Sequence, residues 1–286
     1  MTADIRRTKR PDTERADTRP ARVAAFRRYL RLFVVLCGVS MHRLTTYRAD
    51  FMVGVSSFVV RIGCQLAVIS VVFTHVDSLA GWTYHQVLFL LGFALLPRGI
   101  DRLVTDQLWI LSWQLVRTGE VFRYLIRPVN PLFLLLSERF MYPDGFGELI
   151  LGIVVMVTAL GGGDVQLTLT DWLLIPLLVL CAAVIHAAIK CIVASLAFWT
   201  TSSLHVLSAV NQLSDFAAYP MALYHPALGA VLTWIVPYAF TAAIPVRYLL
   251  FGGSSILALL PVTAAMVALA AVVFARGIRR FEMTGS

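Results

Sequence analysis

Long apolar runs are the feature of this sequence that most limits its fold. A helix needs about 20 apolar residues to cross about 30 Å of hydrocarbon. By that measure we predict six membrane-spanning helices, near residues 51–74, 85–105, 145–161, 172–198, 206–224 and 256–275. Since 59% of the residues are hydrophobic, 14% are charged and the mean hydropathy is +0.79, a soluble domain would lack polar surface. The expected fold class is therefore an all-α integral membrane protein.

Residues 224–253 are apolar but contain residues that break helices. Pro226, Pro237 and Pro245 interrupt this stretch, and two glycines end it. A continuous spanning helix would have to accommodate all of them. We therefore predict short re-entrant or surface helices here rather than a seventh crossing.

Two segments precede the first span. Residues 1–21 are rich in Arg, Thr, Asp and Pro and contain almost no apolar side chains, so they cannot offset the entropy lost on folding. We predict a disordered cytoplasmic tail there. Residues 22–48 are basic and amphipathic, which favours a helix lying in the membrane interface with its Arg side chains among lipid phosphates.

The basic residues are distributed unevenly among the predicted loops. With a cytoplasmic N-terminus, nineteen Lys and Arg residues fall in cytoplasmic segments and one, Arg247, falls in an outer segment. Cytoplasmic loops carry the excess of positive charge, so both termini are expected in the cytoplasm. The net charge of +8 then reflects orientation, and no nucleic-acid partner is expected. Arg outnumbers Lys by 22 to 2, which is typical of GC-rich genomes and suggests a bacterial plasma membrane.

Residues 115–140 form a charged, turn-rich segment between the second and third spans. Gly119 opens and Pro128 closes about two helical turns within it. The apolar residues of these turns share one side and the charged residues lie elsewhere: Phe122, Leu125 and Ile126 against Glu120, Arg123 and Arg127. We predict a short amphipathic helix outside the membrane.

The run Arg-Thr-Gly-Glu-Val-Phe-Arg-Tyr-Leu-Ile-Arg-Pro-Val-Asn-Pro-Leu-Phe, residues 117–133, resembles the cytoplasmic loop of the permease subunits of type-2 ABC exporters. The similarity is to the uncharacterised branch in which two permeases accompany one ATPase. Shorter matching stretches occur at residues 47–51, 137–140, 194–199 and 215–220. The resemblance covers roughly residues 25–280.

This resemblance implies a domain organisation and a set of coupling residues. Residues 22–280 would form the exporter transmembrane domain, with an elbow helix at 22–48 and a coupling region at 115–140. The coupling helix, Glu120 to Arg127, would dock in a groove of the ATPase. Its groove-facing charges would be Arg123 and Arg127, and its apolar plugs would be Phe122 and Leu125.

The resemblance also implies partners. The complex would contain two permeases, identical or sister chains, and two ATPase subunits, all surrounded by membrane lipid. ATP and magnesium would bind in the ATPase, because this chain has no Gly-x-x-x-x-Gly-Lys phosphate loop. We therefore expect a transport subunit that is not itself an enzyme and holds no cofactor. The sequence does not indicate the cargo, although an apolar lid over residues 227–250 would suit a lipidic or amphipathic one.

Several ionisable residues fall inside the predicted spans, where each needs a partner or a route to water. Arg61 and Asp215 lie at similar depths in the first and fifth spans, so we predict a contact between them. The alternative is local bonding of Asp215 and exposure of the Arg61 head at the interface. The spacing of three charges in the second span, Arg98, Asp101 and Arg102, favours local helical pairs.

Two other classes of membrane protein remain as alternatives. An ion-coupled carrier usually has internal repeats and several intramembrane acids, whereas Asp215 is the only deep acid that we expect. An intramembrane enzyme needs a nucleophile and a base at one depth, and His186 is the only His predicted to be well buried. The four cysteines fall in apolar runs without metal-ligand spacing and are expected to be core residues.

Overall fold

The computed structural model describes residues 31, 34–35, 38, 48–138 and 143–284. Within these ranges the regular structure is helical, apart from an isolated bridge between Leu79 and Trp82. This confirms the all-α prediction. The predicted tail at 1–21 lies outside the described residues, as does most of the predicted interfacial helix at 22–48.

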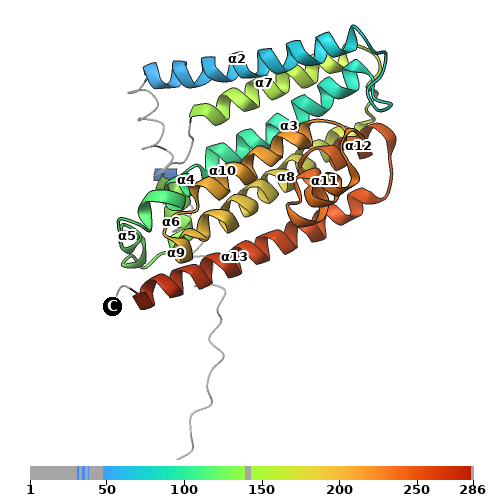
Figure 1. Ribbon diagram of the computed structural model, residues 1–286. Helices are drawn as coiled ribbons and strands as arrows, with labels where there is room; N and C mark the ends of the chain where they lie inside the picture. Colours follow the sequence, from blue (N-terminus) through green and yellow to red (C-terminus); the bar gives the residue numbers. More distant parts are fainter. Residues whose placement is uncertain (1–30, 32–33, 36–37, 39–47, 139–142, 285–286) are drawn as a thin grey trace, which may run out of the picture.

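Six main helices run along the molecule and correspond in position to the predicted spans (Figure 1). They are α2 (Arg48–Phe73), α3 (Tyr84–Thr105), α7 (Pro143–Leu160), α8 (Leu169–Ser195), α10 (Leu204–Leu213) and α13 (Leu259–Thr284). Three of the described helical stretches are long and apolar enough to cross a bilayer: Ser56–Phe73, Leu169–Thr200 and Ser255–Phe281. The exact number of six crossings therefore stays a prediction.

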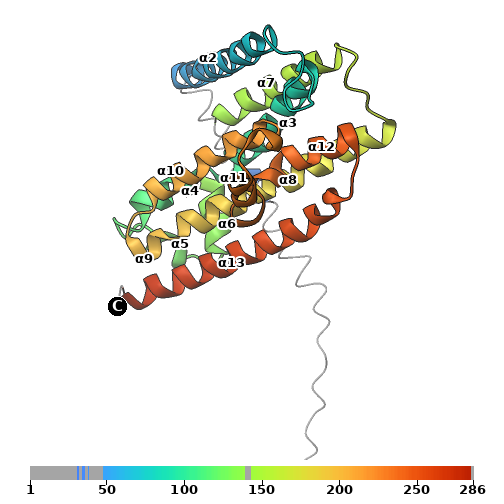
Figure 2. The same cartoon turned by 45° about the vertical axis from the view of Figure 1, so that its right-hand side comes forward.

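Short elements gather at the two ends of the bundle (Figures 1 and 2). At one end, here called the α5 end, lie α4 (Gln107–Ile110), the π-helical η1 (Leu111–Leu115), α5 (Phe122–Leu125), α6 (Pro131–Glu138) and α9 (Ala197–Thr200). The end of α13 lies there too. At the other, the α12 end, lie α11 (Pro226–Ala230), the π-helical η4 (Val231–Ile235), the 3-10 turns η5 (Tyr238–Thr241) and η6 (Ser255–Ala258), and α12 (Ala243–Phe251). The predicted broken structure of residues 224–253 is thus observed.

The long helices pack in an order different from their order in the chain. Helix α2 packs on α7, α7 on α3, α3 on α8, and α8 on α13, so that α2 and α13 form the two edges of the bundle (Figure 1). Helix α10 packs on α8. The central position of α3 is evident from its burial, because every residue from Val87 to Gly99 is buried.

Glycines allow α3 and α7 to approach closely. A Cβ added to Gly92 would lie 2.6 Å from the backbone nitrogen of Met156. One added to Gly145 would lie 2.7 Å from the carbonyl oxygen of Gly99. Since real Cβ atoms do not come this close to backbone, small residues are required at this crossing, as in other membrane helix pairs.

Local capping residues start two of the central helices. The Thr83 hydroxyl accepts a hydrogen bond from the backbone N–H of Gln86, whose side chain accepts one from the Thr83 N–H. Thr168 and Asp171 form the same reciprocal arrangement at the start of α8. Such capping boxes satisfy N–H groups that the first helical turn leaves unpaired.

The predicted fifth span at 206–224 requires correction. Helix α10 ends at Leu213 and continues only as two 3-10 turns, η2 (Ser214–Ala218) and η3 (Met221–Leu223). The Ser214 hydroxyl donates to the Asn211 carbonyl at 2.6 Å, and Pro220 has no N–H with which to continue an α-helix. This segment is a broken helix rather than a continuous one.

Candidate functional site

The segment between Gly119 and Pro128 lies at the α5 end and contains less helix than predicted (Figure 2). Only one α-helical turn forms, Phe122–Leu125, instead of about two. The reason is local: the backbone N–H groups of Phe122 and Arg123 donate three residues back, and Gly119 has a φ of +74°. These tight turns use the backbone groups that a longer α-helix would need.

The apolar side chains of this segment differ in exposure. Leu125, predicted as a plug, is half-buried against the packed cluster beneath the segment. Phe122 is 44% exposed, and its ring centroid lies 5.5 Å from that of Phe281 in α13. Ile126 is 78% exposed and is the apolar residue most available to a partner in this segment.

The charged side chains of the segment also divide into two kinds. Arg123 donates to the Glu138 carboxylate of α6 at 2.8 Å and is 3.9 Å from Glu120. The Tyr124 hydroxyl contacts the same Glu138 carboxylate, and the Gln107 amide donates to it at 3.2 Å. These contacts tie α5 to α4 and α6. Arg127 is exposed beyond the end of α5, with no ion pair to any described residue.

Inside the bundle, Glu148 of α7 joins two other helices. Its side chain is fully buried, and one carboxylate oxygen lies 2.9 Å from Arg61 of α2 and 3.3 Å from Arg102 of α3. Both guanidinium groups also lie over the Phe58 ring, at 5.0 and 4.9 Å from its centroid. Ion pairs with two Arg side chains offset part of the cost of burying this carboxylate.

Asp101 and Lys190 form a second buried pair, between α3 and α8. Their side chains are 3% and 4% exposed, and the Lys190 ammonium contacts the Asp101 carboxylate directly. The ammonium also donates to the Thr105 hydroxyl at 3.0 Å. His186, one turn before Lys190, instead places its ring 5.1 Å from that of Tyr238.

A third ion pair joins α3 to the break after α10. The Arg98 guanidinium lies 2.8 Å from the Asp215 carboxylate and donates to the Ser214 hydroxyl at 3.1 Å. This replaces the predicted Arg61–Asp215 contact, because Arg61 pairs with Glu148. Arg61 and Asp215 both lie among the charges around α3, but each forms its ion pair with a different residue.

Two further expectations about these charges are corrected. Arg98, Asp101 and Arg102 form ion pairs to three different neighbours instead of being confined to local pairs along α3. Asp215 is not the only deep acid, since Glu148 and Asp101 are buried while the Asp215 side chain is 54% exposed. Asp101 and Arg102 project about 100° apart around the helix axis, whereas Arg98 and Arg102 lie one turn apart on the same side, and this spacing could not reveal which neighbouring helices they meet.

Glu148 is the residue of this network that sequence reasoning missed. It lies at the start of the apolar run at 145–161, where a charged residue could be read as belonging to the loop. Its signal was an acid followed directly by the apolar residues Leu149–Leu151, in a chain whose first two predicted spans both carry Arg residues. An acid of that kind is an intramembrane pairing candidate by default.

The network is suited to holding helices together more than to chemistry. Helix α3 supplies Arg98, Asp101 and Arg102 and so connects to α2, α7, α8 and the α10 break. No group of His, Cys, Asp and Glu side chains in the described parts of the chain is arranged to hold a metal ion. At its far end α3 leads through α4 and η1 to the segment that contains α5.

A family model described as ABC-2 family transporter protein matches residues 59–285. The chain belongs to the ABC-2 transporter family. A search of curated proteins gave no match. The matched region includes the whole of the buried network except Phe58 and all of the segment at the α5 end.

Membership of the ABC-2 family identifies the chain as a membrane permease component of an ABC transporter. It agrees with the resemblance drawn from residues 117–133. It also favours transport over the intramembrane-enzyme alternative. An ABC-2 permease normally works with a separate ATP-binding subunit.

Proposed function

We propose that this chain is the permease subunit of an ATP-driven exporter and that the segment from Gly119 to Pro128 docks on its ATPase. ATP and magnesium would bind in that ATPase. The complex would pair the chain with a second permease, identical or sister, and with two ATPase subunits. The α5 end would face the cytoplasm of a bacterial cell, since the basic loops lie there.

The observation that carries this proposal is the exposed pair Ile126 and Arg127. Ile126 is 78% exposed, and Arg127 follows it without an ion pair to any residue that the structure describes. Arg is enriched in protein interfaces, and an exposed apolar side chain beside it suits a pocket on a partner. We therefore revise the expected plug from Leu125 to Ile126 and keep Arg127 as a groove-facing charge.

The packing around α5 supports a route from the ATPase into the membrane. A force on α5 would pass through the Glu138 contacts of Arg123 and Gln107 to α4 and α6. Helix α4 follows α3 directly, and α3 is paired by charge with its neighbours. Rigid-body displacement of packed elements is a common form of such coupling.

The test is the recovery of the ATPase with the tagged permease. Arg127→Glu places a negative charge where the partner would meet a positive one, so we expect at least about a tenfold loss of co-purified ATPase. Ile126→Ser should produce a similar loss. Arg279→Glu, at an exposed position near the end of α13 and outside the segment, is the matched control and should retain the ATPase.

Both segment variants should still insert and elute as the native chain does in detergent, because neither side chain is buried. Normal ATPase recovery with both variants would remove the assignment of this segment. Equal losses with Arg279→Glu would show that general charge at this end, and not the segment, attracts the partner.

A further inference from the structure

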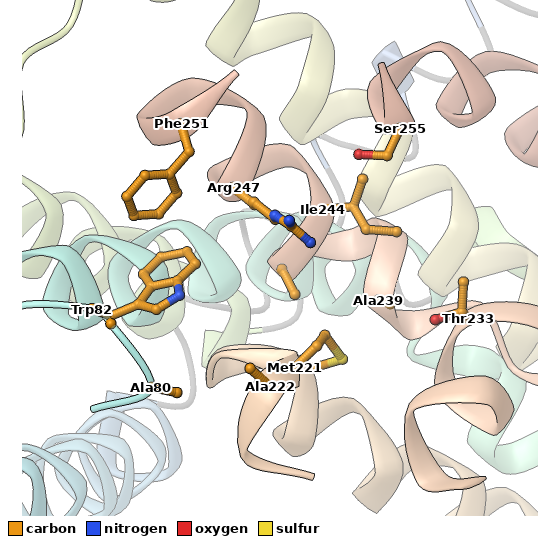
Figure 3. Close-up of a pocket in the computed structure, with 12 residues that line it drawn as sticks. Ala80, Trp82, Met221, Ala222, Thr233, Ala239, Ile244, Arg247, Phe251 and Ser255 are labelled. Atoms are coloured by element: carbon orange, nitrogen blue, oxygen red, sulfur yellow. The ribbon is translucent and has the colours of Figure 1, made fainter. Parts of the chain in front are cut away.

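A cavity of about 530 Å³ opens at the α12 end (Figure 3), at the opposite end of the bundle from the α5 segment (Figure 1). Its wall comes from four parts of the chain: the turn before α3, the η3 turn, the segment of η4 and η5, and α12 with the residues that follow it. A pocket of this volume is in the range that binds a small molecule or part of a lipid.

Arg247 of α12 is the only charged residue among the lining side chains of this cavity. Its guanidinium lies in the middle of the pocket, between Trp82 and Ile244, as Figure 3 shows. Arg247 is exposed and makes no ion pair or side-chain hydrogen bond with any residue in the described ranges. It is therefore free to bind an anion, and a guanidinium suits the two oxygens of a phosphate or carboxylate.

The rest of the lining is mostly apolar and aromatic. Trp82 is 8% exposed, and its ring meets that of Phe251 edge to face with centroids 5.1 Å apart. The turn that presents Trp82 is defined by the Leu79–Trp82 bridge. Met221 and Ile244 line the cavity as well, and Thr233 and Ser255 add two hydroxyl groups. This combination matches a ligand with one anionic group and an apolar body.

The surface beside the cavity indicates where such a ligand comes from. Residues within two positions of the lining residues in sequence are large, apolar and exposed: Trp234 at 76%, Ile235 at 72% and Leu257 at 76%. In a membrane permease, exposed apolar side chains of this kind face lipid. The pocket is then reached from the bilayer and not only from water.

We propose that this pocket binds an anionic lipid, with its phosphate on Arg247 and its proximal apolar portion against Trp82 and Phe251. Binding to the pocket does not depend on the ATPase. That the bound lipid is cargo, or resembles it, rests on the proposed exporter function. The expected lid at residues 227–250 is consistent with this site, because it supplies Thr233, Ile244 and Arg247.

The experiment measures binding to the purified full-length chain in detergent by microscale thermophoresis. The probes are dihexanoyl-phosphatidylglycerol, dihexanoyl-phosphatidylcholine and inorganic phosphate. We expect the phosphatidylglycerol to bind at least about tenfold more tightly than either of the other two. Arg247→Gln should lower its affinity by about tenfold or more, because the charge-assisted pairing is lost.

Two further variants separate the site from general effects. Ala222→Trp narrows the cavity at an exposed position without changing charge and should also weaken phosphatidylglycerol binding. Arg279→Gln removes an exposed charge at the α5 end and should leave it unchanged.

Equal binding of the two lipids, or unchanged phosphatidylglycerol binding in Arg247→Gln, would overturn the proposal. Inorganic phosphate binding as tightly as the lipid would overturn the lipid as the source of the anion. ATPase recovery with Arg247→Gln reports separately on the exporter function, since the α5 segment is untouched. Loss of lipid binding with full ATPase recovery would support both proposals.

Discussion

Lys190 lies inside the bundle with a side chain that is 4% exposed, and the carboxylate of Asp101 is its acidic partner. A buried charge of this kind is costly unless it is paired and hydrogen-bonded. The Thr105 hydroxyl accepts a further hydrogen bond from the ammonium. At the scale of single residues, the stability of the α3–α8 contact therefore depends on keeping opposite charges together.

We predict that Asp101→Asn lowers the free energy of unfolding by about 3 kcal/mol or more, because it leaves Lys190 buried without a carboxylate. Thermal unfolding in detergent would measure the change. The double variant Asp101→Asn with Lys190→Met should recover most of the loss, since neither charge remains. Glu120→Gln is the comparison at an ion pair whose two side chains are 41% and 44% exposed, and its effect should be below about 1 kcal/mol.

A double variant as unstable as Asp101→Asn alone would contradict this account. It would mean that the two side chains matter for their shape or hydrogen bonds and not for mutual neutralisation.

At the scale of elements, the contact of α3 with α7 organises the centre of the bundle. Gly92 and Gly99 of α3 meet α7 close to Gly152 and Gly145, so two glycine pairs seven residues apart bring the backbones together. That approach also sets the depth at which Glu148 reaches Arg102. The ion pair therefore depends on residues that carry no charge.

Gly92→Ala should destabilise the protein by about 1–3 kcal/mol, because its Cβ would lie 2.6 Å from the backbone of Met156. Gly63→Ala in α2 is the matched control, since a Cβ there meets nothing within 4 Å. It should be neutral or slightly stabilising, as alanine favours helix over glycine. Equal thermal midpoints for the two variants would show that the helices separate easily.

At the scale of the whole molecule, the two ends of the bundle differ in kind. The α5 end carries the exposed Arg127 and leads into the central helix α3, whereas the α12 end carries short helices around the Arg247 cavity. The proposed exporter function would need such a division, because the energy source and the release side of an exporter lie on opposite faces of the membrane.

This division predicts the accessibility of introduced cysteines. In a background where the four natural cysteines are replaced by alanine, Ser255→Cys should react with an impermeant maleimide in intact cells. Thr118→Cys should react only after the cells are permeabilised. The reverse pattern would place the α5 end outside and would remove the ATPase-docking proposal.

The sequence alone determined the class of fold and the general location of its parts. The length and spacing of apolar runs are local properties, so the positions of α2, α3, α7, α8 and α13 could be predicted from them. The broken segment at 224–253 followed from its prolines in the same way. The end of α10 at Leu213 was missed. The Ser214 hydroxyl and Pro220 interrupt the backbone hydrogen bonds of the helix there, but they do not change the apolar character of the segment, which was the basis of the prediction.

Only the tertiary structure decided which residues meet. Arg61 and Asp215 were predicted to pair because they lie at similar depths in their spans, but depth does not say which helices face each other. The glycine crossing places α7, with Glu148, beside Arg102 and Arg61, and so leaves Asp215 to Arg98. The exposure of Ile126 rather than Leu125, and the gathering of distant residues around Arg247, have the same origin. They depend on packing between segments far apart in the chain, which no local pattern encodes.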